Sequence, residues 1–422
     1  MKLNKKPVTG MKDILPEEMR IREYVQSVIS STYATYGFTR IETPCVESIE
    51  NLTSKQGGDN EKLIFKVMKR GDKLDEAMTQ VAAGNAYQDS IADSGLRYDL
   101  TVPLVRFYSN NSASLPSPFK ALQMGNVWRA DRPQRGRFRQ FMQCDIDILG
   151  EPGNLAEIEL ILATTATLGK LGFKGFEIRI SDRRLLQAMS AYAGFAESDF
   201  ESVCITLDKL DKIGLDGVRA ELIENGKTEG SVDKYLGLFK NAPGTPSDFA
   251  SRLQGSADKA IAENLEEIIG AVEAAKEADF KMVFDPTLVR GMGYYTGTIF
   301  EIAIPQFGGS CGGGGRYDKM VGRFTGNDVP ACGFSIGFER IVMLLLENGF
   351  NVPEPAKKAY LIEKGVGGER LSSIMAKAKE ERSAGRSILV VRMNKNKKFQ
   401  KEGLEAQGYT EFEEFYNEEL KH

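Results

Sequence analysis

The sequence predicts an α+β fold in which helices flank an antiparallel sheet, a helical segment is inserted into the core, and a small α/β domain follows. Short strand-like segments surround an Arg/Gly-rich turn at 132–137, which favours antiparallel pairing. Residues 185–277 are rich in Ala, Glu and Lys and have helical patterns. Strand and helix patterns alternate after Pro355. The predicted parts are a core at 1–184 and 278–350, an insertion at 185–277 and a tail domain at 356–422.

The first part of the core is predicted from its helix boundaries and turns. Pro16 begins a helix whose apolar residues recur at helical spacing, and Gly37 ends it. Residues 38–43 have strand character and stop at Pro44. Further strands are predicted at 63–68, 96–100, 119–128 and 139–149.

The later elements follow in order along the chain. A helix at 155–171 and a strand at 176–181 precede the insertion, where Gly-Thr-Pro at 244–246 interrupts the helices. Strand signals return at 288–304 and 331–336, and a helix is predicted at 337–348. In the tail we expect a strand at 359–363, a helix at 369–384, a strand at 387–392, another helix and a final stretch rich in Phe, Tyr and Glu.

Composition limits the class of protein. The chain has 422 residues, enough for two or three domains, and 55 Lys+Arg against 59 Asp+Glu give a formal net charge of −4. This balance excludes a polybasic protein, so any contact with nucleic acid must come from local basic patches. No apolar run approaches the ~18–20 residues of a membrane helix, and the first residues do not resemble a signal peptide. Five scattered cysteines without C-x-x-C spacing favour a reducing cytoplasm.

The sequence contains one histidine, His422, at its last position. Catalytic triads, H-E-x-x-H zinc sites and histidine proton shuttles all require an imidazole within the fold. The chemistry therefore falls to carboxylates, arginines, backbone amides or metal-bound phosphates.

Five arginines crowd the turn between two predicted strands. Arginine binds phosphate oxygens through a planar fork that stays charged. On a strand, Arg137 and Arg139 would share one face, and Phe141 would lie on the same face, where its ring could stack on a purine. An exposed basic hairpin is the alternative interpretation. The five are Arg129, Arg132, Arg135, Arg137 and Arg139.

Four aspartates occur in segments that are otherwise apolar and strand-like, namely Asp99, Asp131, Asp145 and Asp147. A buried carboxylate without a partner is costly, so each should meet a cation, a metal ion or a donor from a substrate. For any single one, an ordinary ion pair is the alternative.

Three glycine-containing segments also stand out. Residues 308–315 contain six glycines, which indicate either a flexible turn or backbone that approaches a substrate closely. Residues 288–297 combine Arg290 with three glycines and two tyrosines. Residues 333–340 predict a strand that runs into a helix with Arg340 in its first turn. A cation there opposes the helix dipole, so we expect it to meet a phosphate or carboxylate.

Together these segments resemble the class II aminoacyl-tRNA synthetases and, within that class, the histidyl-tRNA synthetase family. The first helix and the strand ending at Pro44 resemble the first motif of the class. Residues 127–141, with the sequence VWRADRPQRGRFRQF, resemble the second motif, and residues 333–340 resemble the third. The segment RGMGYY at 290–295 is similar to a signature of the histidine enzymes. The resemblance covers residues 1–350 and, weakly, the tail.

The resemblance implies a six-stranded antiparallel sheet, a helical insertion that contacts tRNA, an α/β anticodon-binding domain and a homodimer. It implies the activity of a histidine–tRNA ligase. In that reaction the carboxylate of L-histidine attacks the α-phosphate of ATP, which carries Mg2+, and the histidyl group then passes to the 3′ end of tRNA(His). The resemblance implies no metal ion held by the protein itself.

The resemblance also assigns roles to residues. Arg129 and Arg290 are the implied catalytic residues at the α-phosphate, and Gln134 is implied to meet the tRNA acceptor end. Phe141 and Arg340 are implied to lie on either side of the adenine. The residues implied to bind ATP are Arg129, Arg137, Arg139, Phe141 and Arg340. Those implied to bind histidine are Asp99, Thr101 and Gln143 at the α-amino group, Asp147 with Tyr294 or Tyr295 at the imidazole, and Arg290.

The sequence departs from the family pattern in a few places. Gly293 stands where aspartate is usual, and Asp131 and Asp147 stand where many bacterial members have glutamate. The tail is shorter than the usual anticodon domain. Its candidate phosphate contacts are Lys395, Lys397, Lys398 and Lys401.

Two alternative functions are considered. Some paralogues no longer aminoacylate tRNA and serve as the histidine-sensing regulatory subunit of ATP phosphoribosyltransferase, but they lack the tail and have lost catalytic arginines. A threonyl, prolyl or glycyl synthetase would lack the segment at 290–295.

Overall fold

The computed structural model describes residues 3–53, 62–241, 244–290, 293–353 and 355–417. The chain forms two units. The first contains Met1–Lys12 and Gln26–Leu344, and the second contains Asp13–Val25 and Leu345–His422. The helical insertion therefore belongs to the same unit as the large sheet.

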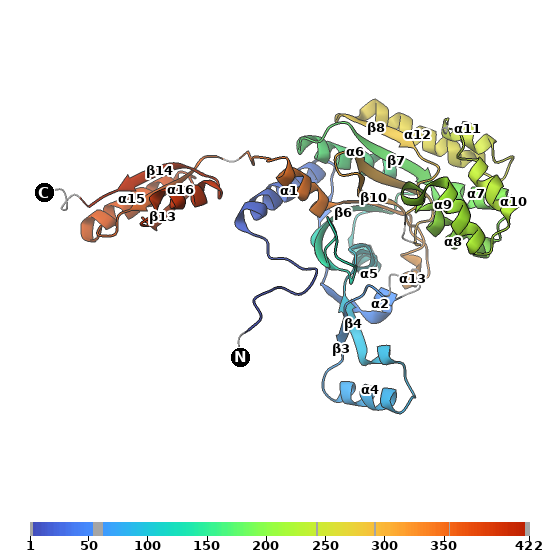
Figure 1. Cartoon of the computed structure of the whole chain (residues 1–422), viewed down its shortest axis with the longest axis horizontal. Coiled ribbons are helices and arrows are strands. Elements are labelled where there is room, and N and C mark those ends of the chain that lie inside the picture. Colours follow the sequence, from blue (N-terminus) through green and yellow to red (C-terminus); the bar gives the residue numbers. More distant parts are fainter. Residues whose placement is uncertain (1–2, 54–61, 242–243, 291–292, 354, 418–422) are drawn as a thin grey trace. The chain divides into compact units, whose positions relative to one another are not determined.

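The first unit is built on an eight-stranded sheet with the order β1-β5-β6-β11-β10-β9-β7-β8 (Figure 1). The six strands from β5 to β7 in this order pair antiparallel, whereas β1 and β8 pair parallel at the two edges. The predicted antiparallel core is therefore confirmed, with a parallel strand added at each edge. The strands are β1 (Thr39–Arg40), β5 (Phe119–Trp128), β6 (Gln140–Leu149), β7 (Phe176–Asp182), β8 (Phe280–Phe284), β9 (Thr298–Ile304), β10 (Gly309–Arg316) and β11 (Ala331–Ile336).

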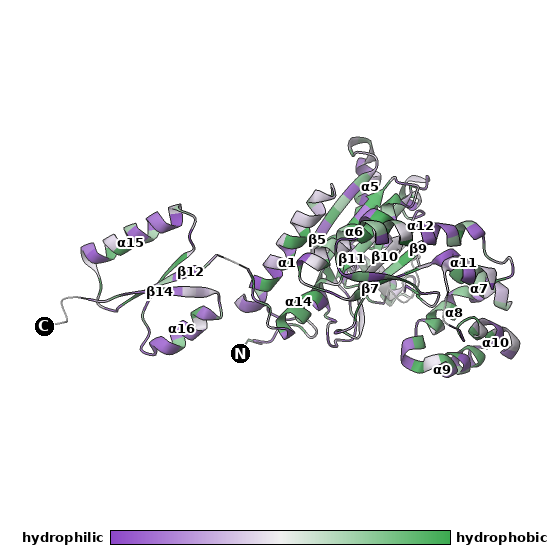
Figure 2. Ribbon diagram, turned by 90° about the horizontal axis from the view of Figure 1, so that it is seen from above, coloured by the Kyte–Doolittle hydropathy of each residue, from purple (hydrophilic) through white to green (hydrophobic). Residues whose placement is uncertain are grey.

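One face of this sheet is apolar and is covered by α6 (Leu155–Lys170), whose Leu160 and Ile161 are fully buried. Figure 2 shows the hydrophobic strands beneath this helix. Tyr33 of α1 (Pro16–Thr35) is buried beside Thr164 and Thr167 of α6. These helices close the core on one face and leave the opposite face of the sheet for polar residues.

Shorter elements surround the sheet. Helix α5 (Thr101–Asn111) packs Phe107 and Tyr108 against Phe119 of β5. Helices α13 (Gly322–Thr325) and α14 (Phe338–Glu347) flank β11 in the chain. A second, three-stranded sheet has the order β2-β4-β3; its described elements are β2 (Val46–Ser48), α2 (Ile49–Thr53), β3 (Lys66–Met68), α4 (Asp72–Ala82) and β4 (Ala92–Leu96).

The insertion is helical, as predicted. The break expected at 244–246 becomes the start of a helix, because the Thr245 side chain and Asp248 form a capping box around Pro246. The helices are α7 (Arg183–Ala193), α8 (Phe200–Leu207), α9 (Leu210–Glu224), α10 (Glu229–Gly237), α11 (Pro246–Ser251) and α12 (Lys259–Ala275).

The second unit contains a three-stranded parallel sheet with the order β13-β12-β14. Alternate residues of the central strand fill two small cores, with Tyr360 and Ile362 on one face and Ala359 and Leu361 on the other. The final Phe/Tyr/Glu-rich stretch is its third strand. The elements are β12 (Lys357–Ile362), α15 (Gly368–Ser383), β13 (Ile388–Arg392), α16 (Lys397–Glu405) and β14 (Tyr409–Phe415).

Several predicted strands are misplaced. The strand predicted at 96–100 ends at Leu96, and the chain then turns because the Val102 amide donates to Asp99 Oδ1 at 3.0 Å. The strand predicted at 38–43 shrinks to Thr39–Arg40. The segment predicted at 288–304 becomes a strand only from Thr298, while the five-residue strand β8 before it was missed.

Candidate active site

The candidate site lies on the polar face of the large sheet. Because successive strand residues alternate between faces, Gln143, Asp145 and Asp147 of β6 share one face. Their neighbours across the sheet are small or polar. Gln123 of β5 and Ser335 of β11 pair with Asp145 from either side.

Glycines form the floor of this face on β10 and β11. A methyl group at Gly313 would lie 2.6 Å from Arg290 Nη1, and one at Gly333 would lie 2.0 Å from Asp147 Oδ1. The glycine run at 308–315 forms most of the central strand β10, so of its two predicted alternatives the flexible turn is wrong. Its glycines leave no room for a Cβ, because Arg290 lies on Gly313 and the backbone of β11 lies against Gly312 and Gly314.

Three aspartates form a buried carboxylate cluster of Asp99, Asp145 and Asp147. Burial raises the pKa of Asp99 to about 6, and burial raises the pKa of Asp145 to about 7 with a further contribution from the charge of Asp99. Burial and then the charge of Asp145 raise the pKa of Asp147 well above its ordinary value. The three carboxylates lie close together, and a bound cation would balance their negative charge.

Three buried acceptor oxygens around this cluster have no hydrogen-bond partner among the residues that the structure describes. They are Asp99 Oδ2, Gln143 Oε1 and Asp145 Oδ1. Buried polar atoms are almost always hydrogen-bonded, and leaving one unpaired costs about 1–3 kcal/mol. Acceptors gathered without donors are complementary to a ligand that brings N–H groups.

Three tyrosines line the cluster. Tyr294 and Tyr295 are buried with their ring centroids 4.8 Å apart, and Tyr294 lies beside Thr101. The hydroxyl of Tyr317 donates to Asp147 Oδ1 at 2.5 Å. This bond fixes the Asp147 carboxylate and leaves its second oxygen for another donor.

Arg129 lies beside the carboxylate cluster, at the end of β5. Its Nε donates to the carbonyl of Tyr98 at 2.8 Å, and its guanidinium lies 5.2 Å from the ring centroid of Phe141. Its charge acts to lower the pKa values of both Asp99 and Asp145. The structure thus places Arg129 beside Asp99, a predicted histidine-binding residue, and beside Phe141, a predicted ATP-binding residue.

Arg290 lies in the segment between β8 and β9, and Arg340 lies in the first turn of α14. Arg290 donates to Glu301 Oε2 of β9 at 2.7 Å. Arg340 donates to the carbonyl of Ser310. The pKa of Arg340 is lowered, first by burial and then by repulsion from Arg137 and Arg290. Burial raises the pKa of Tyr295, the charge of Arg290 lowers it and the charge of Asp145 raises it, so Tyr295 lies near both groups.

The basic hairpin differs from its prediction. Gln134 and Arg137 pair across its turn, with the Arg137 amide donating to the Gln134 carbonyl at 2.9 Å. Arg139 donates from Nε to the carbonyl of Asp131 at 3.1 Å, and its amide donates to the carbonyl of Gly10 at 2.8 Å. Neither arginine lies on a strand, so the predicted shared strand face is wrong. Arg137 lies near Arg340, while Arg139 is held against the N-terminal segment.

Sequence reasoning missed several residues of this site. Tyr317 lies two residues after the last glycine of the run at 308–315, and this position was the signal in the sequence for a site residue. The ring of Phe307 lies 5.1 Å from the Arg340 guanidinium and 5.8 Å from that of Arg135, and nothing in its loop sequence predicted this. Glu301 and Ser335 were hidden in apolar strands. Gly291 and Met292 of the segment at 290–295, and His422, lie outside the described residues.

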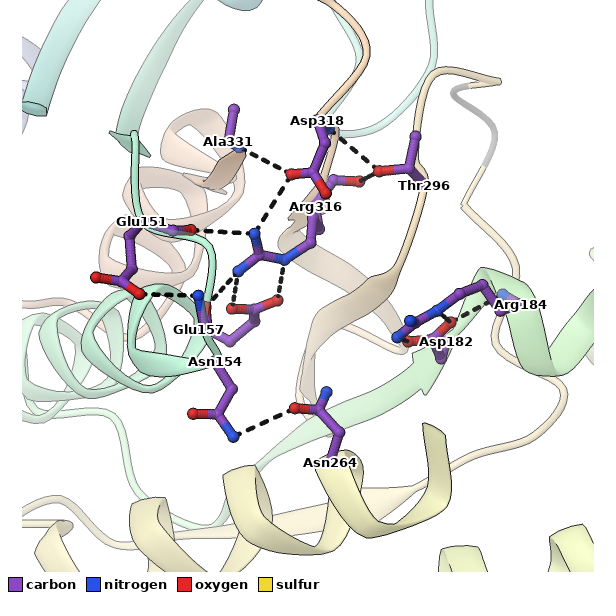
Figure 3. Close-up of polar contacts among 11 residues, drawn as sticks. Glu151, Asn154, Glu157, Asp182, Arg184, Asn264, Thr296, Arg316, Asp318 and Ala331 are labelled. Carbon is purple, nitrogen blue, oxygen red and sulfur yellow. Dashed lines mark hydrogen bonds and ion pairs between the residues drawn. The ribbon is translucent and has the colours of Figure 1, made fainter. Parts of the chain in front are cut away.

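A second buried charge cluster supports the site from the end of β10 (Figure 3). Arg316 donates to both oxygens of Glu157, at 2.7 and 2.6 Å, and also to Asp318 and to the carbonyls of Glu151 and Gly153. The backbone carbonyl of Arg316 accepts the Thr296 amide at 2.7 Å. This Arg316 cluster ties the strand before Tyr317 to the loop that follows Tyr295.

Two properties of the described residues bear on a metal site and on a membrane-spanning helix. In the ranges that the structure describes, no group of three or more His, Cys, Asp or Glu is arranged to hold a metal ion. Over those same ranges, no helix has the length and hydropathy needed to span a membrane.

Comparison with known proteins agrees with the resemblance. The sequence profile described as histidyl-tRNA synthetase matches residues 10–81 and 87–341. The histidine–tRNA ligase of Leifsonia xyli subsp. xyli is 44% identical over 418 residues, which cover 96% of this chain and 94% of that protein. The histidyl-tRNA synthetase of Nostoc sp. PCC 7120 has a TM-score of 0.76 at 27% identity and covers 96% of this chain and 90% of its own.

A Bacillus halodurans protein, described as an ATP phosphoribosyltransferase regulatory subunit/histidyl-tRNA synthetase, also matches with a TM-score of 0.76. Its identity is 19%, with 99% of this chain and 100% of that chain covered. At this identity the likeness shows the fold alone.

Proposed function

The chain belongs to the histidyl-tRNA synthetase family and has the activity of a histidine–tRNA ligase; on this premise we propose how its polar sheet face performs the reaction. The observation that carries the proposal is the set of three unpaired acceptors facing arginines across one sheet. The acceptors suit the ammonium group of an amino acid, and the arginines suit the phosphates of ATP.

Histidine binds over β6. Its ammonium group donates to Asp99 and Gln143, with Thr101 beside them, and its imidazole meets Asp147 with Tyr294 or Tyr295. The Tyr317 hydroxyl occupies Asp147 Oδ1, so the other carboxylate oxygen accepts an imidazole N–H. A site built from such bonds rejects analogues by roughly 10⁴–10⁵, because a wrong ligand leaves buried polar groups unpaired.

ATP binds with its α-phosphate near Arg129 and Arg290. The adenine lies between Phe141 and Arg340, and Arg137 and Arg139 bind the outer phosphates. The Mg2+ that accompanies ATP enters with the substrate and neutralises phosphate oxygens. In the first step a histidine carboxylate oxygen bonds to the α-phosphorus as the bond to the β-phosphate oxygen breaks, so pyrophosphate leaves.

This step requires preorganised positive charge rather than an enzyme nucleophile or an imidazole base. Arg290 is already held by Glu301, and Arg129 by the Tyr98 carbonyl, so neither must be ordered during the reaction. In the second step the terminal ribose hydroxyl of tRNA(His) attacks the histidyl carbonyl and AMP leaves. Gln134 at the hairpin tip meets the acceptor end, and the insertion at 185–277 contacts the tRNA.

The test is histidine-dependent exchange of pyrophosphate into ATP, without tRNA, measured in parallel for all twenty amino acids. We expect exchange with histidine alone. Exchange with another amino acid would contradict the histidine site. A folded protein without exchange for any amino acid, but with histidine binding, would favour the regulatory paralogue.

The tail is proposed as a tRNA-binding domain that reads the anticodon. Lys397 and Lys401 both pair with Glu414 at 2.7 Å each, and Lys398 lies 4.0 Å from Glu402. Lys395 and Lys398 remain on the exposed surface beside Phe399, whose side chain is 70% exposed. A basic surface with an exposed aromatic ring suits a single-stranded loop.

Substitution of Lys395 and Lys398 by Ala tests the tail. We expect weaker charging of tRNA(His), with the salt slope of tRNA binding reduced by about 2, and unchanged pyrophosphate exchange. Unchanged tRNA binding would contradict the role of this surface.

Two further parts of the proposal follow the family. The protein is proposed to act as a homodimer, which sedimentation or light scattering tests directly. It is proposed to act in the cytoplasm, and the absence of disulfides among its five cysteines is consistent with a reducing compartment.

A further inference from the structure

Asp145 is a buried carboxylate that forms no ion pair with the described residues; burial raises its pKa, and a hydrogen bond from the Ser335 side chain lowers it. Its Oδ2 faces Gln143 Nε2 at 3.4 Å, which is long for a hydrogen bond, and its Oδ1 has no partner among the described residues. The two arginines whose charges lower its pKa, Arg129 and Arg97, hydrogen-bond to backbone carbonyls. Arg97 donates to the carbonyls of Thr43 and Asn126, and Arg129 donates to that of Tyr98.

The position of Asp145 on the sheet places it inside the histidine site. It lies between Gln143 and Asp147 on the same face of β6, so it is two residues from the proposed ammonium contact and two from the proposed imidazole contact. The Asp99 carboxylate is close enough to raise its pKa. An unpaired oxygen on each of Asp99, Gln143 and Asp145 matches the three N–H donors of a primary ammonium group.

We propose that Asp145 is a further histidine-binding residue, whose carboxylate accepts the α-ammonium group of the substrate together with Asp99 and Gln143. This inference rests on the proposed function, because it adds a contact to the same site. It explains why two carboxylates are buried side by side with unpaired oxygens. The ammonium supplies the positive charge and the donors that the protein leaves out.

The proposal has a consequence for pH. The groups that face Asp145 are Asp99, Asp147, Arg97, Arg129, Gln143, Ser335 and Tyr295. Because burial raises the pKa of Asp145 to about 7 and that of Asp99 to about 6, the empty site is partly protonated near neutral pH. A cation binds the ionised carboxylates, so histidine affinity should fall as the pH decreases from about 8 to 6, with protons released on binding.

The experiment compares two ligands of the full-length chain by calorimetry: L-histidine, and imidazole propionate, which lacks the amino group. In Asp145→Asn we expect the Kd of histidine to rise by roughly 10–100-fold, as for loss of a charge-assisted hydrogen bond. The affinity for imidazole propionate should change less than about twofold. The number of protons released by histidine, measured in buffers of different ionisation enthalpy, should also fall.

Controls separate the possible failures. Asp145→Glu keeps the charge and should preserve more of the preference for histidine over the analogue than Asp145→Asn does. Asp93→Asn, at an exposed position of β4, should change the affinity for neither ligand. Equal losses for both ligands in Asp145→Asn, or no loss for either, would overturn this inference alone. A wild-type chain that binds no histidine would overturn the proposed function as well.

Discussion

Two clusters of buried charge lie on the same sheet, and they differ in how completely the protein satisfies them. In the Arg316 cluster every guanidinium nitrogen donates, and both oxygens of Glu157 accept. In the carboxylate cluster, oxygens of Asp99 and Asp145 are left without a donor among the described residues. Complete internal pairing marks charge that holds the fold together, and incomplete pairing marks charge reserved for a ligand.

The largest effect, on stability, is expected in the Arg316 cluster. Glu157→Gln breaks a bidentate, buried ion pair and leaves Asp318 as the acidic partner of Arg316, so the free energy of unfolding should fall by up to about 3–5 kcal/mol. Denaturant titration measures this loss. Glu263→Gln, which removes the exposed Lys259–Glu263 pair, should change stability little. Equal losses in both variants would contradict the assignment of Arg316 as a structural anchor.

Arg290 is proposed to act at the α-phosphate of ATP, so its removal should affect the reaction more than the fold. Arg290→Ala should slow histidyl-adenylate formation by roughly 100–1000-fold, about 2.7–4 kcal/mol, as for the loss of one preorganised charge donor. Single-turnover kinetics without tRNA provides the measurement. If the variant changed only the affinity for tRNA, Arg290 would have no role at the α-phosphate.

Gly333→Ala tests whether the carboxylate cluster requires a glycine beneath it. The added methyl group would lie 2.0 Å from Asp147 Oδ1, so the carboxylate must move and its bond from Tyr317 must weaken. We expect the KM for histidine to rise by roughly 10–100-fold while the KM for ATP changes little. Gly270→Ala, in a helix with open space around it, is the matched control. An unchanged KM for histidine would separate Asp147 from substrate binding.

Asp145→Asn should change the free energy of unfolding less than Glu157→Gln does, and in the opposite direction. Burial raises the folded-state pKa of Asp145 to about 7, so the folded protein binds this proton more tightly than the unfolded chain does. Wild-type stability therefore falls as the pH rises from about 4 to 7, and the full cost remains above 7. At pH 8 without ligand the variant should be more stable by about 1–3 kcal/mol, and the difference should vanish near pH 4. Destabilisation at pH 8 would show that Asp145 serves the fold.

The sequence allowed much of the sheet to be predicted, because strands such as Phe119–Trp128 carry enough apolar and aromatic residues to mark their own limits. It failed at the glycine run, since glycine has no strand preference of its own. The Arg290 side chain on Gly313 and the β11 backbone against Gly312 and Gly314 come from other segments, and they explain why this strand lacks Cβ atoms.

The candidate site shows the same limit. Asp145 and Asp147 look equivalent in the sequence, two residues apart in one apolar strand. Their difference depends on Tyr317, which lies 170 residues away in the chain and bonds to Asp147 alone. Partners supplied by tertiary structure decide which carboxylate remains available, and no local pattern records them.

A crystal structure of the protein with bound L-histidine tests the central claim most directly. We expect the ammonium nitrogen within about 2.7–3.2 Å of Asp99 Oδ2, Gln143 Oε1 and Asp145 Oδ1. The Arg316 cluster should keep all its bonds. Histidine bound with its ammonium group turned away from these oxygens would contradict the claim that the protein leaves them unpaired for its substrate.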